Sequence, residues 1–255
     1  AYNRRTGLEI PIHVDAASGG FILPFLHPER KWDFRLKWVL SISTSGHKFG
    51  LVYPGLGWVV WRDKSYLPQE MSFSVNYLGA NITQVGLNFS RPAAQVLGQY
   101  YNFIRLGFEG YKEVQQNSMD IARYAHEQIG AMPQFTLYSK EVVNPLFIWY
   151  MNPDYAKSAK WTLFDLQAAL QQSGWMVPAY TLPDDLESVV VMRIVVRQGM
   201  SRDMTDMLLG DIRNAVSEFE KLEYPTQSRI KMDKNIPQQG KVFTHTHHCA
   251  KAAAK

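Results

Sequence analysis

Cysteine is almost absent from this chain, because its 255 residues include only one, Cys249. A single cysteine cannot form an internal disulfide bond, which is typical of proteins kept in the reducing cytoplasm. The sequence also has no run of about 18 apolar residues, so we expect no membrane-spanning helix. No signal peptide opens it. Because the lone cysteine fits a reducing compartment, we expect a cytoplasmic location.

The chain also lacks a strong excess of either positive or negative charge. The 27 basic residues and 23 acidic residues give a formal net charge of +4, and the basic residues are scattered. A nucleic-acid-binding surface needs clustered basic residues, so nucleic acid is not an expected partner. The hydrophobic share of 46% and the charged share of 20% are those of an ordinary globular protein that can bury a sizeable core.

One lysine stands between two glycines, just after a hydrophobic stretch. Residues 39–43 are predicted to form a short buried strand, and Gly46 and Gly50 break regular structure on both sides of Lys48. Lysine usually lies on a solvated face, whereas this position favours a pocket in which its amine attacks an aldehyde. An exposed loop lysine is the alternative, and the short Gly-His-Lys motif does not decide between the two.

A carboxylate ends another predicted strand, residues 10–15. Asp15 is followed by small residues at positions 16–20, which leave room for a flat ring. Open α/β sheets bind their ligands at such strand ends. Pyridoxal 5'-phosphate (PLP) needs a lysine for its aldehyde and a carboxylate that keeps its pyridine nitrogen protonated. We therefore interpret Lys48 and Asp15 as a candidate pair for this cofactor.

Four blocks of the sequence, in the same order along the chain, resemble those of the glutamate decarboxylase family. They are residues 13–20, 43–50, 88–92 and 190–194. The family consists of PLP-dependent enzymes of fold type I, so the resemblance implies an α/β fold with a large mixed sheet and a small α/β C-terminal domain. It also implies α-decarboxylation of L-glutamate to 4-aminobutyrate and CO2, a part in acid resistance, and self-association as a dimer or hexamer.

The resemblance assigns cofactor-binding roles to five residues. Lys48 would form the Schiff base with PLP, and Asp15 would hold the protonated ring nitrogen. Ala17 would lie against the cofactor ring. Ser45 and His47 would contact the phosphate group.

Further roles fall on residues later in the chain. Ser90 would reach the phosphate of a neighbouring subunit, although from the sequence alone it is better interpreted as a helix cap. Arg193 would hold the substrate α-carboxylate, with a structural salt bridge as the alternative. Tyr77 and Leu78 lie in residues 71–88, which lack strong periodicity and form either a lid over the substrate or a plain loop.

The tail after Pro225 is polar, and we expect it to be mobile. The resemblance implies that His245 closes the active site at neutral pH. A metal site is the alternative, built from His245, His247, His248 and Cys249. We do not favour it, because one short tail rarely supplies a closed coordination shell with supporting residues.

The expected organisation has three parts: residues 1–110 as the end of the PLP-binding domain, 111–225 as the small domain, and 226–255 as the tail. Helical spacing predicts helices over residues 90–106 and 111–129, separated at Gly107. Members of the family carry a long part ahead of the block around Asp15, so we expect a C-terminal portion of a longer enzyme. The alternatives are another fold type I amino-acid decarboxylase or lyase, and a non-catalytic structural fragment.

Overall fold

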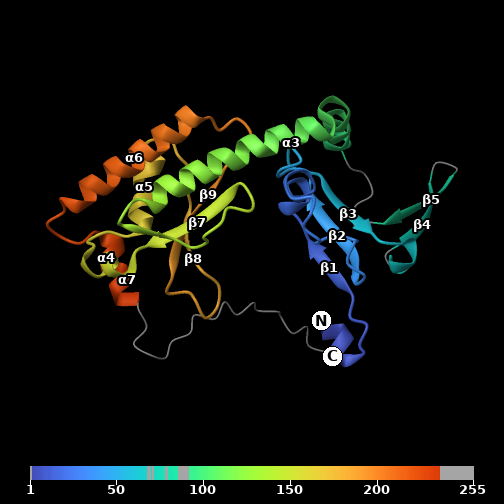
Figure 1. The fold of residues 1–255 in the computed structure, drawn as a ribbon, viewed down its shortest axis with the longest axis horizontal. Coiled ribbons are helices and arrows are strands. Elements are labelled where there is room, and N and C mark those ends of the chain that lie inside the picture. The colour runs from blue at the N-terminus through green and yellow to red at the C-terminus, as the bar shows by residue number, and fades with distance from the viewer. Residues whose placement is uncertain (1, 68–69, 71, 78–79, 86–91, 236–255) are drawn as a thin grey trace, which may run out of the picture. The chain divides into compact units, whose positions relative to one another are not determined.

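The computed structural model describes residues 2–67, 70, 72–77, 80–85 and 92–235. It has the α/β architecture that the sequence predicts (Figure 1). Contacts between residues divide the chain into two compact units. The first unit takes residues 1–128, 139–147 and 194–206, and the second takes residues 129–138, 148–193 and 207–255. The predicted domain boundary after residue 110 falls inside the long helix α3 (Ala94–Gly130).

The first unit contains a mixed sheet with the order β1-β2-β3. β1 (Ile12–Asp15) pairs in parallel with β2 (Val39–Ser45), and β3 (Gly57–Trp61) runs antiparallel along β2. The register places Asp15 opposite Ser43. The strands predicted around Asp15 and before Lys48 are thereby confirmed. Short helical segments complete this region: α1 (Tyr2–Thr6), η1 (Gly19–Phe21), α2 (Leu23–Leu26) and η2 (Lys64–Tyr66).

The strand β3 is less buried than its apolar sequence suggests. An apolar strand of this kind is expected in a sheet that is covered on both faces. In the structure the side chain of Val59 is 55% exposed and that of Val60 is 46% exposed. β3 is an edge strand of the described sheet, and Val59 and Val60, which point to opposite faces of a strand, are both exposed. The expectation of burial on both faces is wrong for these residues.

Two strands form a hairpin where the sequence suggested an irregular segment. β4 (Ser72–Tyr77) and β5 (Ala80–Val85) pair antiparallel, with Tyr77 opposite Ala80. The plain loop considered as one alternative is therefore wrong for residues 72–77 and 80–85. Apolar and polar residues alternate from 72 to 77, which is the pattern of a strand. The lid role of Tyr77 stays a prediction, and Leu78 lies outside the described residues.

Helix α3 is sharply kinked at Gly107, where φ is 58° and ψ is −163°. This conformation is essentially restricted to glycine, because a Cβ would collide with the neighbouring backbone. The predicted break between two helices is therefore confirmed. The described helix begins at Ala94. Ser90 itself lies outside the described residues.

The other sheet has the order β6-β7-β9-β8. Its strands are β6 (Phe135–Leu137), β7 (Leu146–Met151), β8 (Ala179–Thr181) and β9 (Val190–Val195). Four helices accompany them: α4 (Pro153–Ser158), α5 (Leu163–Gln172), α6 (Arg202–Glu220) and α7 (Gln227–Asn235). No helix in the described part of the chain is both long enough and apolar enough to cross a lipid bilayer.

Local capping interactions fix the helices of the second unit. Asp165 Oδ2 accepts hydrogen bonds from the backbone N–H of Thr162 at 2.8 Å and from its hydroxyl at 2.9 Å, which begins α5. The same oxygen accepts from the Thr226 hydroxyl at 2.8 Å, next to α7. Residues 227–235 are thus helical within the segment expected to be a mobile tail. Asn152 caps α4 by accepting hydrogen bonds from the backbone N–H groups of Asp154 and Tyr155.

Aromatic packing forms the core of the second unit. Trp161 is completely buried and stacks on Phe219 of α6, with ring centroids 5.0 Å apart. The ring of Phe135 of β6 also meets it edge-on, with centroids 6.3 Å apart. Aromatic pairs in such geometries add to the stabilisation that burial alone supplies.

The kink predicts opposite effects for two substitutions in the same helix. Gly107→Ala places a Cβ in a strained conformation and should destabilise the protein by about 1–3 kcal/mol. Gly98→Ala should stabilise it by about 0.5–1 kcal/mol, because alanine favours a helix. A Cβ at position 98 would meet only Val52 Cγ1, at 3.7 Å. Urea unfolding gives the free energy of unfolding of each variant. Equal values for Gly107→Ala and Gly98→Ala would contradict a strained backbone at Gly107.

Candidate active site

The parallel pairing of β1 and β2 brings Asp15 and Lys48 to the same pocket. Asp15 is the last residue of β1, and Lys48 lies in the turn that follows β2. Both line an open pocket with a volume of about 400 Å³, together with Ala17, Trp32 and Asn144. Small residues at 16–19 form part of the wall, which leaves space for a planar ligand beside the carboxylate.

The carboxylate of Asp15 is held by its own strand end. Its Oδ1 accepts a hydrogen bond from the backbone N–H of Ala17 at 3.0 Å, and the Ser43 hydroxyl lies 3.5 Å away. His13 contacts that hydroxyl through Nε2 at 3.3 Å, and its Nδ1 lies 2.8 Å from the Ser41 hydroxyl. Within the described chain no partner occupies Asp15 Oδ2. This oxygen can therefore accept a proton-bearing nitrogen of a ligand.

Asn144 is a pocket residue that sequence reasoning missed. Its Oδ1 is buried and has no hydrogen-bond partner in the described chain. An orphaned polar atom of this kind calls for an explanation such as an absent ligand. The available signal was a polar side chain inside the apolar run 142–149. Together with the amine of Lys48 and the carboxylate of Asp15, the orphaned amide fits a polar, planar cofactor.

The two residues predicted to contact the phosphate do not line this pocket. Ser45 lies beside it, and its backbone N–H donates to the carbonyl oxygen of Ala17 at 3.2 Å. His47 Nδ1 lies 3.0 Å from the carbonyl oxygen of Leu56, so Nδ1 is the donor. In the neutral ring Nε2 then carries no proton, so this nitrogen can donate to a phosphate only in the charged form. The phosphate-binding roles of Ser45 and His47 stay predictions.

Arg193 lies in β9 and belongs to the second unit. Its side chain is exposed, and the guanidinium carbon lies 5.7 Å from the ring centroid of Tyr180. Among the described residues Arg193 has no ion pair, so the structural salt bridge considered above finds no support. Its substrate-binding role stays a prediction. Ser90 and His245 lie outside the described residues, as do the other residues of the proposed metal site.

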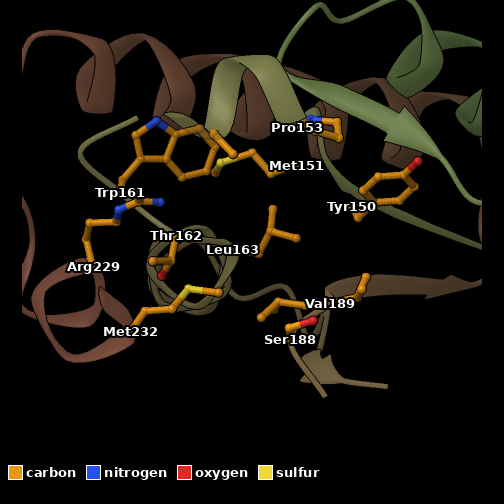
Figure 2. Close-up of a pocket in the computed structure, with 12 residues that line it drawn as sticks. Tyr150, Met151, Pro153, Trp161, Thr162, Leu163, Ser188, Val189, Arg229 and Met232 are labelled. Atoms are coloured by element: carbon orange, nitrogen blue, oxygen red, sulfur yellow. The ribbon is translucent and has the colours of Figure 1, made fainter. Parts of the chain in front are cut away.

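A second pocket, of about 230 Å³, belongs to the second unit (Figure 2). Its lining is mostly apolar and includes Trp161, Leu163 and Met232. Arg229 and Thr162 also lie on its wall. None of the predicted site residues is part of this lining. The described residues also contain no group of three or more His, Cys, Asp or Glu side chains that could hold a metal ion.

Aromatic rings pack around the ring of Tyr111, whose hydroxyl bonds to the turn that carries Lys48. Its ring contacts those of Phe21, Phe25 and Phe103, with centroids between 5.3 and 5.9 Å apart. Burial raises the pKa of Tyr111 to about 12, and a hydrogen bond from Gln99 acts in the opposite direction. The hydroxyl donates to the carbonyl oxygen of Gly50 at 3.0 Å. It therefore remains a donor throughout the physiological pH range.

The family model of the pyridoxal-dependent decarboxylase conserved domain matches residues 4–151, which include the whole pocket. The chain belongs to the pyridoxal-dependent decarboxylase family. This membership confirms the predicted cofactor class, and the pocket residues Asp15 and Lys48 carry the chemical groups that PLP requires.

Several glutamate decarboxylases are among the relatives of this chain. The chain is 50% identical to glutamate decarboxylase 5 of Arabidopsis thaliana over 220 residues. The matched region is 86% of this chain and 44% of that protein. It is 46% identical over 218 residues to glutamate decarboxylase beta of Listeria innocua, covering 86% and 47%. The sequence resemblance is thereby confirmed, and the chain spans about half the length of these relatives.

A solved structure shows the same fold. The glutamate decarboxylase of Lactobacillus brevis superposes with a TM-score of 0.81 at 46% identity, covering 87% of this chain and 50% of that one. The fold type I assignment made from the sequence is confirmed by this similarity.

The buried phenol of Tyr111 predicts a loss of stability at high pH. Because folding raises its pKa to about 12, its contribution is complete below about pH 10 and is lost as the pH rises toward about 12. Tyr111→Phe removes this dependence and costs about 1 kcal/mol at neutral pH through the lost hydrogen bond. The stability advantage of the wild type should therefore shrink between about pH 8 and about pH 11. Urea unfolding measures the free-energy difference between the wild type and Tyr111→Phe at each pH. A difference that does not change with pH would contradict the raised pKa of Tyr111.

Proposed function

We propose that this chain forms part of a glutamate decarboxylase, which converts L-glutamate into 4-aminobutyrate and CO2. The observation that carries the proposal is the shared pocket of Asp15 and Lys48 at the end of two parallel strands. Support comes from family membership and from relatives of 46–50% identity that are named glutamate decarboxylases. The cytoplasm remains the proposed location.

The pocket residues provide what is needed to hold PLP. The Lys48 amine is the group that reacts with the aldehyde of the cofactor. Asp15 Oδ2 is available for the protonated ring nitrogen, because Oδ1 is already fixed by the Ala17 N–H. The small side chain of Ala17 leaves room for the ring. Ser45, His47 and, from a neighbouring subunit, Ser90 remain the proposed phosphate contacts.

PLP supplies an electron sink for the electron pair that remains when the bond between Cα and the carboxylate breaks. Asp15 supports that chemistry by holding the proton on the ring nitrogen. The carboxylate carbon leaves as CO2, and a proton takes its place on Cα. Each turnover thus consumes one proton, which is consistent with the proposed part in acid resistance. Exclusion of water favours this outcome, and a lid containing Tyr77 and Leu78 is proposed to provide it.

The substrate carboxylate next to Cα is assigned to Arg193, whose planar guanidinium suits two parallel hydrogen bonds. The predicted site residues do not include one for the distal carboxylate of glutamate. Another amino-acid decarboxylase or lyase of the same fold is therefore the second candidate. It shares the roles of Lys48 and Asp15 and differs only in the substrate.

Self-association is proposed from an exposed apolar face on the first half of α3. Its five side chains are 46–70% exposed: Val96, Leu97, Tyr100, Tyr101 and Ile104. A contiguous apolar patch of this kind is typical of a surface that binds protein. A dimer or hexamer remains the proposed assembly, and its shared sites would bring Ser90 to the neighbouring cofactor.

Replacement of the proposed catalytic lysine tests this function. In the full-length protein Lys48→Ala should lower CO2 release from glutamate on the order of a hundredfold or more, because the positioned amine is lost. Lys64→Ala, which removes an exposed lysine outside the pocket, is the matched control and should retain full activity. Unchanged release in Lys48→Ala would contradict the proposal. Measuring CO2 release by the wild type from glutamate and from a panel of other amino acids distinguishes the two candidate functions.

A further inference from the structure

Helix α3 holds the backbone of the Lys48 turn, which we define as residues 46–51. Four of its side chains donate hydrogen bonds to three successive carbonyl oxygens just after Lys48. The pairs are Gln115 to Phe49 at 2.8 Å, Gln99 to Gly50 at 2.8 Å, Tyr111 to Gly50 at 3.0 Å, and Asn102 to Leu51 at 2.9 Å. Gly46, Phe49 and Gly50 are buried, so carbonyls in this turn need hydrogen-bond donors from the protein.

The donors come from both sides of the kink in α3. Gln99 and Asn102 precede Gly107, whereas Tyr111 and Gln115 follow it. The Gln99 amide also donates to the Tyr111 hydroxyl at 2.8 Å, which links the two halves. The kink therefore lets one helix approach the same turn from two directions.

The turn and Gln99 fit each other closely. A Cβ added at Gly46 would lie 2.5 Å from Gln99 Oε1, and one at Gly50 would lie 2.8 Å from the same atom. Both distances are too short for a real side chain, so only glycine permits this approach. Leu51 has a φ of 66°, a left-handed conformation that a leucine keeps only when its surroundings enforce it. The turn is thus fixed by contacts and not by its own preference.

Stability alone does not explain the two buried amides. Gln99 and Gln115 are completely buried, and the Oε1 atom of each has no hydrogen-bond partner in the described chain. A buried polar atom without a partner is unfavourable, so an apolar side chain of similar shape would avoid that penalty. The carbonyl of Gly50 would still be satisfied by Tyr111 if Gln99 were replaced. The amides are therefore better explained by the geometry that they impose.

We infer that Gln99 and Gln115 are positioning residues, which fix the Lys48 turn so that the lysine amine faces the pocket containing Asp15. The inference rests on the proposed function, because it takes Lys48 as the residue that reacts with PLP. Side chains of α3 thereby set the reactivity of Lys48 through the backbone of its turn.

The test measures the reactivity of individual lysines in the full-length protein. PLP is added, the bonds between its aldehyde and lysine amines are reduced with borohydride, and peptide mapping gives the rate of labelling at each lysine. Exposed Lys64 serves as an internal reference. Gln99→Met and Gln115→Met are compared with Gln116→Met, which changes an exposed amide on the same helix that bonds to Asp120 at 2.7 Å.

The expected result is a fall of about tenfold or more in the labelling rate of Lys48 in Gln99→Met and Gln115→Met, because a small displacement of a reacting group has effects of this size. Labelling of Lys64 should not change, and Gln116→Met should match the wild type. Urea unfolding run in parallel should show little change for Gln99→Met. If Gln115→Met does not fold, Gln99→Met decides the outcome.

Two results overturn the inference, and they are distinguishable. If the wild type labels Lys48 faster than Lys64, and folded Gln99→Met does the same at an equal rate, the positioning role is wrong and the proposed function stands. If the wild type labels Lys48 no faster than Lys64, the proposed function fails together with the inference.

Discussion

The parallel pairing of β1 with β2 is the constraint on which the candidate site depends. Parallel strands end at the same edge of a sheet, so the carboxylate that ends β1 lies beside the turn that follows β2. Side chains alternate between faces along a strand, so a slip of one residue in β1 would turn Asp15 away from the pocket. The buried cluster of Ala16, Val39 and Ile42 stabilises the observed register, because the same slip would expose its apolar groups.

The second constraint acts on the turn itself, which the sheet does not position. Hydrogen bonds from α3 to the carbonyls of Phe49, Gly50 and Leu51 replace the regular pairing that ends with β2. The helix reaches them because it bends at Gly107. Sheet and helix thus act together: the strands supply a carboxylate, and the helix fixes the amine that faces it. Both residues can then hold opposite ends of one planar cofactor.

Local signals in the sequence were sufficient for much of this architecture. Hydrophobic runs predicted the strands that carry Asp15 and precede Lys48, and Gly107 predicted the break in α3. The hairpin of β4 and β5 was missed because its short alternation, from 72 to 77, was not weighed against an irregular loop. The only local signal for Asn144 was a polar residue within an apolar run, and the hydrogen bonds that Gln99 makes to the turn had none. Both arise from contacts between distant segments, which only the folded chain brings together.

The central claim is that Lys48 and Asp15 bind opposite ends of one PLP molecule. The most direct measurement is a crystal structure of the full-length protein prepared with the cofactor. We predict a covalent bond between Lys48 Nζ and the aldehyde carbon of the cofactor, with a carboxylate oxygen of Asp15 about 2.7–3.2 Å from the ring nitrogen. Attachment of the cofactor to another lysine, or a ring nitrogen without Asp15 beside it, would contradict the account.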